Sequence, residues 1–411
     1  MRQRVRPPLL MSYASFILIG IAAGGGGVLL LAQMTDYGVN RAEIGITFFT
    51  GTMGFVLAGL SAGALIHRFG VRITLAAGAG LYALATLYLA SRPPFALFVV
   101  VQLVTGFGVG VLESALNAYL AALPGATPLL NRLHAFFGVG ALIGPVLAAM
   151  IVGFSSWKVM YLILAVAYVP LIAGFLIAYP GRRRAEPAGQ AREAPRQMPQ
   201  TPGNGDGSML RAALRERSVL LGAAMLAVYV GLEIGVGNWA FSYLVQARDL
   251  TSTLAGYSLS GYWLGLTLGR FLISPIAAKT GVTTAGMIYA CLAGVTAAAT
   301  LAWLSPGAAA ASLGLMLLGF CLGPIFPTTM SIAPQLTQAR LIPTAIGVMN
   351  AASTVGGAAL PWLAGAITQS GGIRLLMPFT VALALLQFAV WWPLATRIRG
   401  PATEFSSQQA G

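Results

Sequence analysis

Long apolar stretches, interrupted by short charged, Pro-rich or Gly-rich segments, run along almost the whole chain of 411 residues. A helix needs about 20 mostly apolar residues to cross the roughly 30 Å hydrocarbon core of a bilayer. The pattern predicts twelve membrane-spanning helices, over residues 9–33, 43–66, 72–90, 95–121, 131–154, 157–180, 218–245, 253–277, 282–304, 308–333, 342–369 and 373–396. The first stretch has no small-residue cleavage site, which favours an uncleaved first helix over a signal peptide.

One long polar segment divides the predicted helices six and six. Residues 181–217 contain eight Arg, four acids and several Pro and Gly, a composition typical of flexible linkers. We therefore predict an all-α integral membrane protein made of two six-helix bundles. The bundles cover residues 1–180 and 218–396, joined by a cytoplasmic linker at 181–217 and followed by a cytoplasmic tail at 397–411.

The composition narrows the class of protein. Apolar residues (AVILMFWYC) make up 57% of the chain and charged residues 8%. Soluble domains carry about 25% charged residues, so a soluble enzyme is excluded, and the apolar content excludes a disordered chain. Two His and two separated Cys are too few for a zinc site, and the phosphate-binding pattern G-x-x-x-x-G-K-[ST] does not occur. We expect no metal, no cofactor and no ATP-driven pumping.

The formal net charge of +14 suggests at first a polyanionic partner such as nucleic acid. With the N-terminus in the cytoplasm, however, nineteen of the 24 cations fall on the inner side of the predicted topology. The five on the outer side are Arg41, Arg92, Lys158, Arg248 and Arg374. The inner excess predicts that both termini are cytoplasmic. We therefore expect the inner (cytoplasmic) membrane of a bacterium, the lipid bilayer as a partner, and no nucleic acid.

The two predicted bundles show traces of an internal repeat. A shift of 211 positions aligns Gly20 with Gly231, and a shift of 213 lays the Gly-rich stretch 106–110 over 319–323. Parallel six-helix repeats are a known plan of secondary transporters, in which the solute site lies near the bilayer midplane between the halves. The repeat therefore predicts pseudo-symmetric bundles that open alternately to the two sides of the membrane.

Acidic residues are scarce inside the predicted helices. Eight of the ten lie in loops, the linker, the tail or helix ends: Asp36, Glu43, Glu186, Glu193, Asp206, Glu216, Asp249 and Glu404. The other two, Glu113 and Glu233, lie deep within spans, where a charge costs about 3 kcal/mol. Apolar surroundings favour the protonated form of a carboxyl group, so both are candidates for proton coupling. Alternatively, Glu113 is a structural acid neutralised by His134 or Arg270, and Glu233 forms an inter-helix hydrogen bond.

Polar and aromatic side chains of the spans are candidates for solute binding. They are Asn117, Asn238, Trp239, Tyr262 and Asn350. The amides would form hydrogen bonds with the hydroxyl groups of a sugar, and the rings would stack on its apolar faces. The alternative for each ring is a place in the protein core or against lipid.

Two charged or titratable side chains in the spans are candidates for gating. His134 follows a predicted N-cap at Asn131, and a hydrogen-bonded gate or a packing role is favoured over a proton shuttle. Arg270 is expected to extend its charge to the cytoplasmic surface rather than to pair with Glu233.

Two prolines, Pro324 and Pro327, lie within the predicted helix 308–333. Proline has no N–H group and leaves a helix carbonyl without its partner, so the helix is expected to kink there. The kink is either a gating hinge or an architectural bend.

Residues 63–72, between the second and third predicted helices, read GALIHRFGVR and resemble the major facilitator signature G-x-x-x-D-R-x-G-R. Arg68 matches the signature arginine and is a gating candidate by this resemblance, whereas His67 stands where the family usually has Asp. Further stretches resemble the fucose/galactose-proton symporter group of that superfamily: 106–117, 131–145, 262–270 and 323–327.

This resemblance implies the major facilitator fold and a sugar permease driven by protons. It places Glu113 at the position of a helix 4 carboxylate that is important for coupling or binding. Helices 1, 4, 7 and 10 line the cavity in the superfamily, so Glu233 is expected to face Glu113 from the opposite half. Members of the group can carry a further acid inside helix 1, but this helix has none before Asp36.

The leading hypothesis is a secondary active transporter that moves a small polar solute, a sugar, together with protons by alternating access, and that works as a monomer. Proton-driven efflux of amphipathic compounds is the alternative within transport, favoured by the sparse polar residues of the spans. A non-transporting membrane sensor on the same scaffold is a further alternative. An enzyme is not expected, because the outer loops are short and no nucleophile and base stand together.

Overall fold

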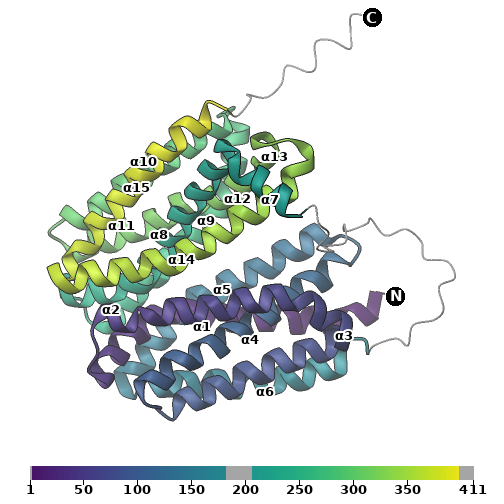
Figure 1. Cartoon of the computed structure of the whole chain (residues 1–411). Helices are drawn as coiled ribbons and strands as arrows, with labels where there is room; N and C mark the ends of the chain where they lie inside the picture. Colours follow the sequence, from purple (N-terminus) through teal and green to yellow (C-terminus); the bar gives the residue numbers. More distant parts are fainter. Residues whose placement is uncertain (1, 182–205, 398–411) are drawn as a thin grey trace, which may run out of the picture. The chain divides into compact units, whose positions relative to one another are not determined.

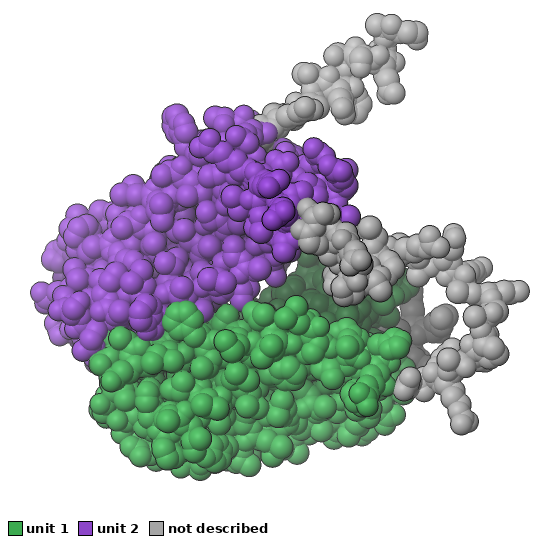
Figure 2. All heavy atoms as spheres, viewed as in Figure 1, with its two compact units in different colours: residues 1–207 green, residues 208–411 purple. Residues whose placement is uncertain are grey.

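The computed structural model describes residues 2–181 and 206–397, and within these ranges the regular structure is entirely helical. The chain forms two compact units, Met1–Gly207 and Ser208–Gly411, which Figure 2 shows in green and purple. Most of the predicted linker and tail lie outside the described residues. The boundaries proposed for the two bundles therefore remain a prediction.

Unit 1 contains six helices: α1 (Arg2–Tyr37), α2 (Arg41–Ile44), α3 (Ile46–Ala90), α4 (Phe95–Ala121), α5 (Ala126–Phe154) and α6 (Trp157–Ala178) (Figure 1). The second and third predicted spans both belong to α3. A straight helix of its 45 residues would be about 68 Å long, twice the hydrocarbon thickness. The helix is instead broken at Gly70 (φ 77°, ψ 160°), a backbone conformation that glycine adopts without strain.

Unit 2 contains α7 (Asp206–Arg215), α8 (Arg217–Ala247), α9 (Ser252–Lys279), α10 (Thr284–Leu304), α11 (Ala308–Leu322), α12 (Ile325–Ser331), α13 (Ala333–Leu336), α14 (Ile342–Gly371) and α15 (Leu376–Ala395), with short 3₁₀ turns at Ala339–Leu341 and Ile373–Leu375. The predicted span 308–333 is interrupted between α11 and α12 at Gly323 and Pro324, the place where a kink was expected. Because α7 lies within the predicted flexible linker, that expectation is wrong for residues 206–215.

Ten described helical segments are long and apolar enough to cross a membrane. One of them, Arg41–Ala90, holds two predicted spans, and α9 is not among the ten. α9 falls short by composition because Ser, Thr, Tyr, Gly and Arg270 replace apolar residues along it. With α9 included and Arg41–Ala90 counted twice, the described helices supply the twelve predicted spans, six in each unit.

The internal repeat is visible in the way the helices pair. In unit 1, α1 packs along α5 and α3 along α4, and in unit 2, α8 packs along α14 and α9 along α11. Glycines let the backbones approach closely: a Cβ atom at Gly140 would overlap the Ile17 carbonyl of α1, and one at Gly356 would overlap the Ala227 carbonyl of α8. The first and fifth spans of each unit thus meet in the same manner.

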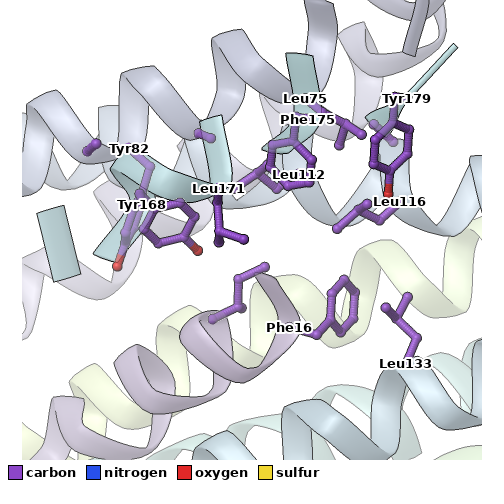
Figure 3. Close-up of a cluster of buried hydrophobic side chains, with 14 of the residues drawn as sticks. Phe16, Leu75, Tyr82, Leu112, Leu116, Leu133, Tyr168, Leu171, Phe175 and Tyr179 are labelled. Carbon is purple, nitrogen blue, oxygen red and sulfur yellow. The ribbon is translucent and has the colours of Figure 1, made fainter. Parts of the chain in front are cut away.

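The core of unit 1 gathers aromatic and aliphatic side chains from α1, α3, α4, α5 and α6 (Figure 3). On α4, Leu112 and Leu116 are fully buried in this cluster. Successive residues of a helix are turned by about 100°, so Glu113 and Asn117 lie on the neighbouring face of α4. The core therefore determines which way the polar face of α4 is directed.

Candidate functional site

In unit 1, the deep acid Glu113 lies half-buried in the middle of α4. The described residues contain two ion pairs, Arg92–Asp36 and Arg270–Glu233, so Glu113 has no cationic partner among them. Arg270, one of its two predicted neutralising partners, is engaged by the other acid. Asn117 does share the face of Glu113, but its Nδ2 atom donates to the main-chain oxygen of Glu113 (2.9 Å) rather than to the carboxylate.

In unit 2, the deep acid Glu233 of α8 forms an ion pair with Arg270 of α9, with 3.0 Å between Nη2 and Oε1. The expectation that Arg270 reaches for the cytoplasmic surface is therefore wrong. An ion pair between a guanidinium group and a carboxylate reduces the free-energy cost of holding either charge within a membrane. The Glu233 side chain is 14% exposed and the Arg270 side chain 38%, so the pair is accessible from one side.

Aromatic residues hold this pair in place. The Tyr262 hydroxyl donates to the main-chain oxygen of Glu233 (2.9 Å), which ties α9 to α8 at the level of the pair. Tyr229, one turn before Glu233, lies beside both charged groups, and its ring contacts Phe326 with 5.9 Å between centroids. Its fully buried hydroxyl makes no hydrogen bond of normal geometry. Two buried tyrosine side chains thus surround the pair.

The helix interruption of unit 2 lies against the same place. A Cβ atom at Gly323 would lie 2.5 Å from the main-chain nitrogen of Arg270, so the break packs directly onto this part of α9. Pro324 precedes α12, and Pro327 is its third residue, where proline is tolerated because the first turn has no N–H partners to lose. A gating role for either proline remains a prediction.

The structure separates the residues predicted to bind solute. Tyr262 meets the ion pair, but it is fully buried and cannot stack on a solute. Trp239 is also fully buried, and its Nε1 donates to the Pro361 carbonyl of α14 (2.8 Å), so it joins two helices and the predicted role is not supported. Asn238 donates to the Ile234 carbonyl of its own helix (2.9 Å). Asn350 is exposed on α14.

We expect a Trp239→Phe variant to lose about 1 kcal/mol of stability, the usual net contribution of one hydrogen bond, while the half-saturation concentration of solute stays unchanged. The ring is kept and the bond to the Pro361 carbonyl is lost. Thermal unfolding and solute exchange of the same preparation measure the two quantities. A weaker affinity for solute with unaltered thermal stability would instead support a role of Trp239 in solute binding.

The remaining gating candidates lie elsewhere in unit 1. Arg68 is exposed next to the break at Gly70, and its guanidinium carbon lies 5.2 Å from the centroid of the Phe69 ring. α5 begins at Ala126 rather than at the predicted N-cap Asn131, so His134 lies in its third turn. The His134 ring is exposed and meets Phe16 edge to face, with centroids 5.6 Å apart.

A polar cluster in unit 1 was not predicted. Gln33 of α1 is buried, and its Nε2 donates to the Tyr161 hydroxyl of α6 (3.2 Å). Gln102 of α4 is within reach of the same hydroxyl and accepts a hydrogen bond from Thr105 (3.0 Å). An amide in an apolar span is costly to bury in the same way as an acid, so a search for uncharged polar residues would have found this cluster.

Comparison with known proteins decides the family. The family model described as Major Facilitator Superfamily matches residues 10–361 and 240–410. The chain belongs to the major facilitator superfamily. As a member of this superfamily it is a multi-pass membrane transporter and not an enzyme, and its twelve helices form two bundles.

Known proteins resemble the chain over most of its length. "Bypass of stop codon protein 6" of Saccharomyces cerevisiae is 27% identical over 408 residues, covering 92% of this chain and 80% of the relative. The glucose/mannose transporter GlcP of Bacillus subtilis is 23% identical over 405 residues, covering 97% and 96%. Among solved structures, a mutant form of the nucleoside transporter NupG superposes with a TM-score of 0.77 at 14% identity, covering 96% of this chain and 100% of that one, which shows a shared fold.

Proposed function

We propose that this major facilitator protein moves a neutral sugar across the membrane by alternating access, together with a proton carried by Glu113. Glu113 carries this proposal, because it is the one deep acid of unit 1 and has no cationic partner among the described residues. A carboxyl group in that position can be neutralised only by taking up a proton, which makes its charge depend on the transport cycle.

A neutral solute is favoured by the charges of unit 2 and by one relative. Glu233 and Arg270 neutralise each other, so unit 2 presents no net deep charge to attract an ion. The relative from Bacillus subtilis, which aligns with nearly the whole chain, is a glucose/mannose transporter. D-Glucose is therefore the first solute to test, and amphipathic compounds are the comparison.

The orientation and setting belong to the same proposal. Nineteen of 24 cations lie on the inner side when both termini are cytoplasmic, which supports that topology in the inner membrane of a bacterium. One chain carries both halves of the repeat. We therefore propose that a monomer surrounded by lipid carries out transport.

The decisive variant is Glu113→Gln, tested in proteoliposomes. A gradient of one pH unit can drive about tenfold accumulation by a symporter that moves one proton per solute. We expect the wild-type protein to accumulate labelled D-glucose under such a gradient and Glu113→Gln to reach only the outside concentration. Exchange of labelled for unlabelled glucose, which needs no net proton movement, should persist in the variant. Ser114→Ala, which alters the next residue of α4, is the matched control.

The pH dependence of exchange gives a second readout. Wild-type exchange should fall as the pH rises through the titration of Glu113, because the protonated form accompanies the sugar. The Gln side chain imitates that form at every pH, so the variant should show a flat profile. Accumulation by Glu113→Gln under the gradient would refute the coupling role. Exchange of amphipathic compounds but of no sugar by the wild-type protein would instead support efflux.

A further inference from the structure

We infer that the Glu233–Arg270 pair is the element of unit 2 that recognises adjacent hydroxyl groups of the solute, and that it selects uncharged solutes without carrying the proton. The inference rests on the proposed function, because it names the residues that such a sugar would meet. It also assigns different tasks to the two deep acids, which the sequence alone treats alike.

The geometry of the pair leaves binding capacity on both partners. The ion pair uses Oε1 of Glu233 and Nη2 of Arg270. A carboxylate has a second oxygen that can accept hydrogen bonds, and a guanidinium group carries five N–H donors in a planar fork. Two adjacent hydroxyl groups can donate to the carboxylate and accept from the guanidinium at the same time. The exposed fractions of 38% for Arg270 and 14% for Glu233 leave part of each side chain accessible.

Among the described residues, Glu233 has one cationic partner, Arg270. The titratable groups that face it are Arg270, Tyr229 and Tyr262. The other helices packed against α8, namely α11, α12, α13, α14 and α15, contain no charged residue. Arg270 therefore compensates the charge of Glu233. If Glu233 were neutral, the charge of Arg270 would have no counter-charge nearby.

Other charged side chains near α8 and α9 lie close to the ends of these helices, far from the pair. Arg217 lies about 24 Å from Glu233 along α8, and Lys279 about 13 Å from Arg270 along α9. The 3₁₀ turn Ile373–Leu375 also packs against α8 and contributes Arg374, whose charge acts on Tyr243, about 15 Å from Glu233 along the helix. None of these groups can replace Arg270 as the partner of Glu233.

Charge selection follows from this mutual dependence. A solute that carries an anion would compete for Arg270 and leave Glu233 uncompensated, and a cation would do the reverse. Breaking a pair of this kind by replacing one partner is costly, whereas hydroxyl groups can bind beside the pair without separating it.

The test measures how charge preference changes in variants of the pair. Exchange of labelled D-glucose in proteoliposomes is competed at pH 6.5 by unlabelled D-glucose, anionic D-glucuronate or cationic D-glucosamine. We expect glucose alone to compete in the wild-type protein. In Glu233→Gln, the half-saturation concentration for glucose should rise about tenfold or more, as for a lost hydrogen bond to a charged group, and glucuronate should now compete. In Arg270→Gln, glucosamine should become the competitor.

Two further variants separate recognition from folding. The double variant Glu233→Gln/Arg270→Gln contains no uncompensated charge, so it should elute as a single folded species, bind glucose about tenfold more weakly and admit neither charged sugar. Thr267→Val, which removes a hydroxyl group of α9 bonded to its own helix at Trp263, should match the wild-type protein.

Accumulation under a pH gradient distinguishes the role of Glu233 from that of Glu113. At saturating glucose, Glu233→Gln should still accumulate sugar under a pH gradient, whereas Glu113→Gln should not. The inference is overturned by an unchanged half-saturation concentration in the double variant, by single variants that weaken without any change of charge preference, or by loss of accumulation in Glu233→Gln. Wild-type protein that exchanges none of the three sugars would overturn the proposed function and this assignment together.

Discussion

Alanine at Gly265 or Gly269 is expected to destabilise unit 2 severely, whereas alanine at Gly261 is expected to be tolerated. The three glycines follow one another at intervals of four along α9 and so lie on one face, the face that packs along α11. A Cβ atom at Gly265 would overlap the carbonyl oxygen of Met316, and one at Gly269 would overlap that of Phe320. The obstacle is backbone in both cases, so no side chain can rotate away.

The expected loss of stability depends on whether the new methyl group meets a side chain or the backbone. Adding a methyl group to a tightly packed interior lowers the free energy of unfolding by about 1 to 3 kcal/mol where side chains can shift. Because the new methyl group meets backbone atoms here, we expect a loss of about 3 kcal/mol or more. At Gly261 a Cβ atom would lie 3.8 Å from the Cβ atom of Met316, which is an ordinary contact. Alanine there gains helix propensity of up to about 1 kcal/mol.

Thermal unfolding of the purified variants in detergent, followed by tryptophan fluorescence, measures all three. The matched set shares the helix, the face and the substitution, and differs only in what the new methyl group meets. Equal melting temperatures for Gly261→Ala and Gly265→Ala would show that α9 and α11 are not in close backbone contact. The same reasoning applies in unit 1, where a Cβ atom at Gly54 would overlap the Leu103 carbonyl of α4.

The helices could be predicted from the apolar pattern because a membrane imposes one length on every span. α9 is the least apolar of these spans, since this helix carries polar residues of the site and is not among the ten segments that are long and apolar enough to cross a membrane. The run of apolar residues in the sequence nevertheless predicted a span at 253–277. The break at Gly323 and Pro324 was also predictable, because proline acts on its own helix and needs no tertiary contact.

The ion pair was only the less favoured alternative from the sequence, although both of its members were identified. Glu233 and Arg270 stand 37 positions apart on different helices, and their meeting depends on how α8 and α9 pack. The sequence favoured extension of Arg270 to the cytoplasmic surface over this pair, because a long cationic side chain can reach water without any partner. The same limit applies to Trp239, because the face of a helix that meets a neighbour is unknown until that neighbour is placed.

Arg248 is expected to be the most sensitive charged residue at the end of unit 2 where α8 ends and α10 ends. It lies just after α8, where its Nε donates to the Tyr243 hydroxyl (2.8 Å). Its Nη1 donates to the Ser305 carbonyl (2.7 Å), and its Nη2 to the carbonyls of Ala302 (2.6 Å) and Trp303. The last carbonyls of a helix lack partners within it, so Arg248 caps α10 from the end of α8.

Arg248→Met should therefore lose about 3 kcal/mol of stability, because several hydrogen bonds from a charged donor vanish together and the carbonyls at the end of α10 are left unpaired. Arg248→Lys should lose nearly as much, since an ammonium group keeps the charge but cannot reproduce the planar fork. Arg340→Met is the matched control, because Arg340 is exposed and bonds one side chain, Gln338. Its loss should stay within about 0.5 kcal/mol.

Hydrogen exchange locates the effect that thermal unfolding measures. Amides of the last turn of α10 and the start of the loop after it should exchange faster in Arg248→Met, while those of unit 1 should keep the wild-type rates. Recovery of wild-type stability in Arg248→Lys would mean that charge alone holds the two helices together. Because α8 carries Glu233 at its centre and Arg248 just after its last residue, loosening this end of α8 should also raise the half-saturation concentration for glucose without abolishing accumulation under a pH gradient.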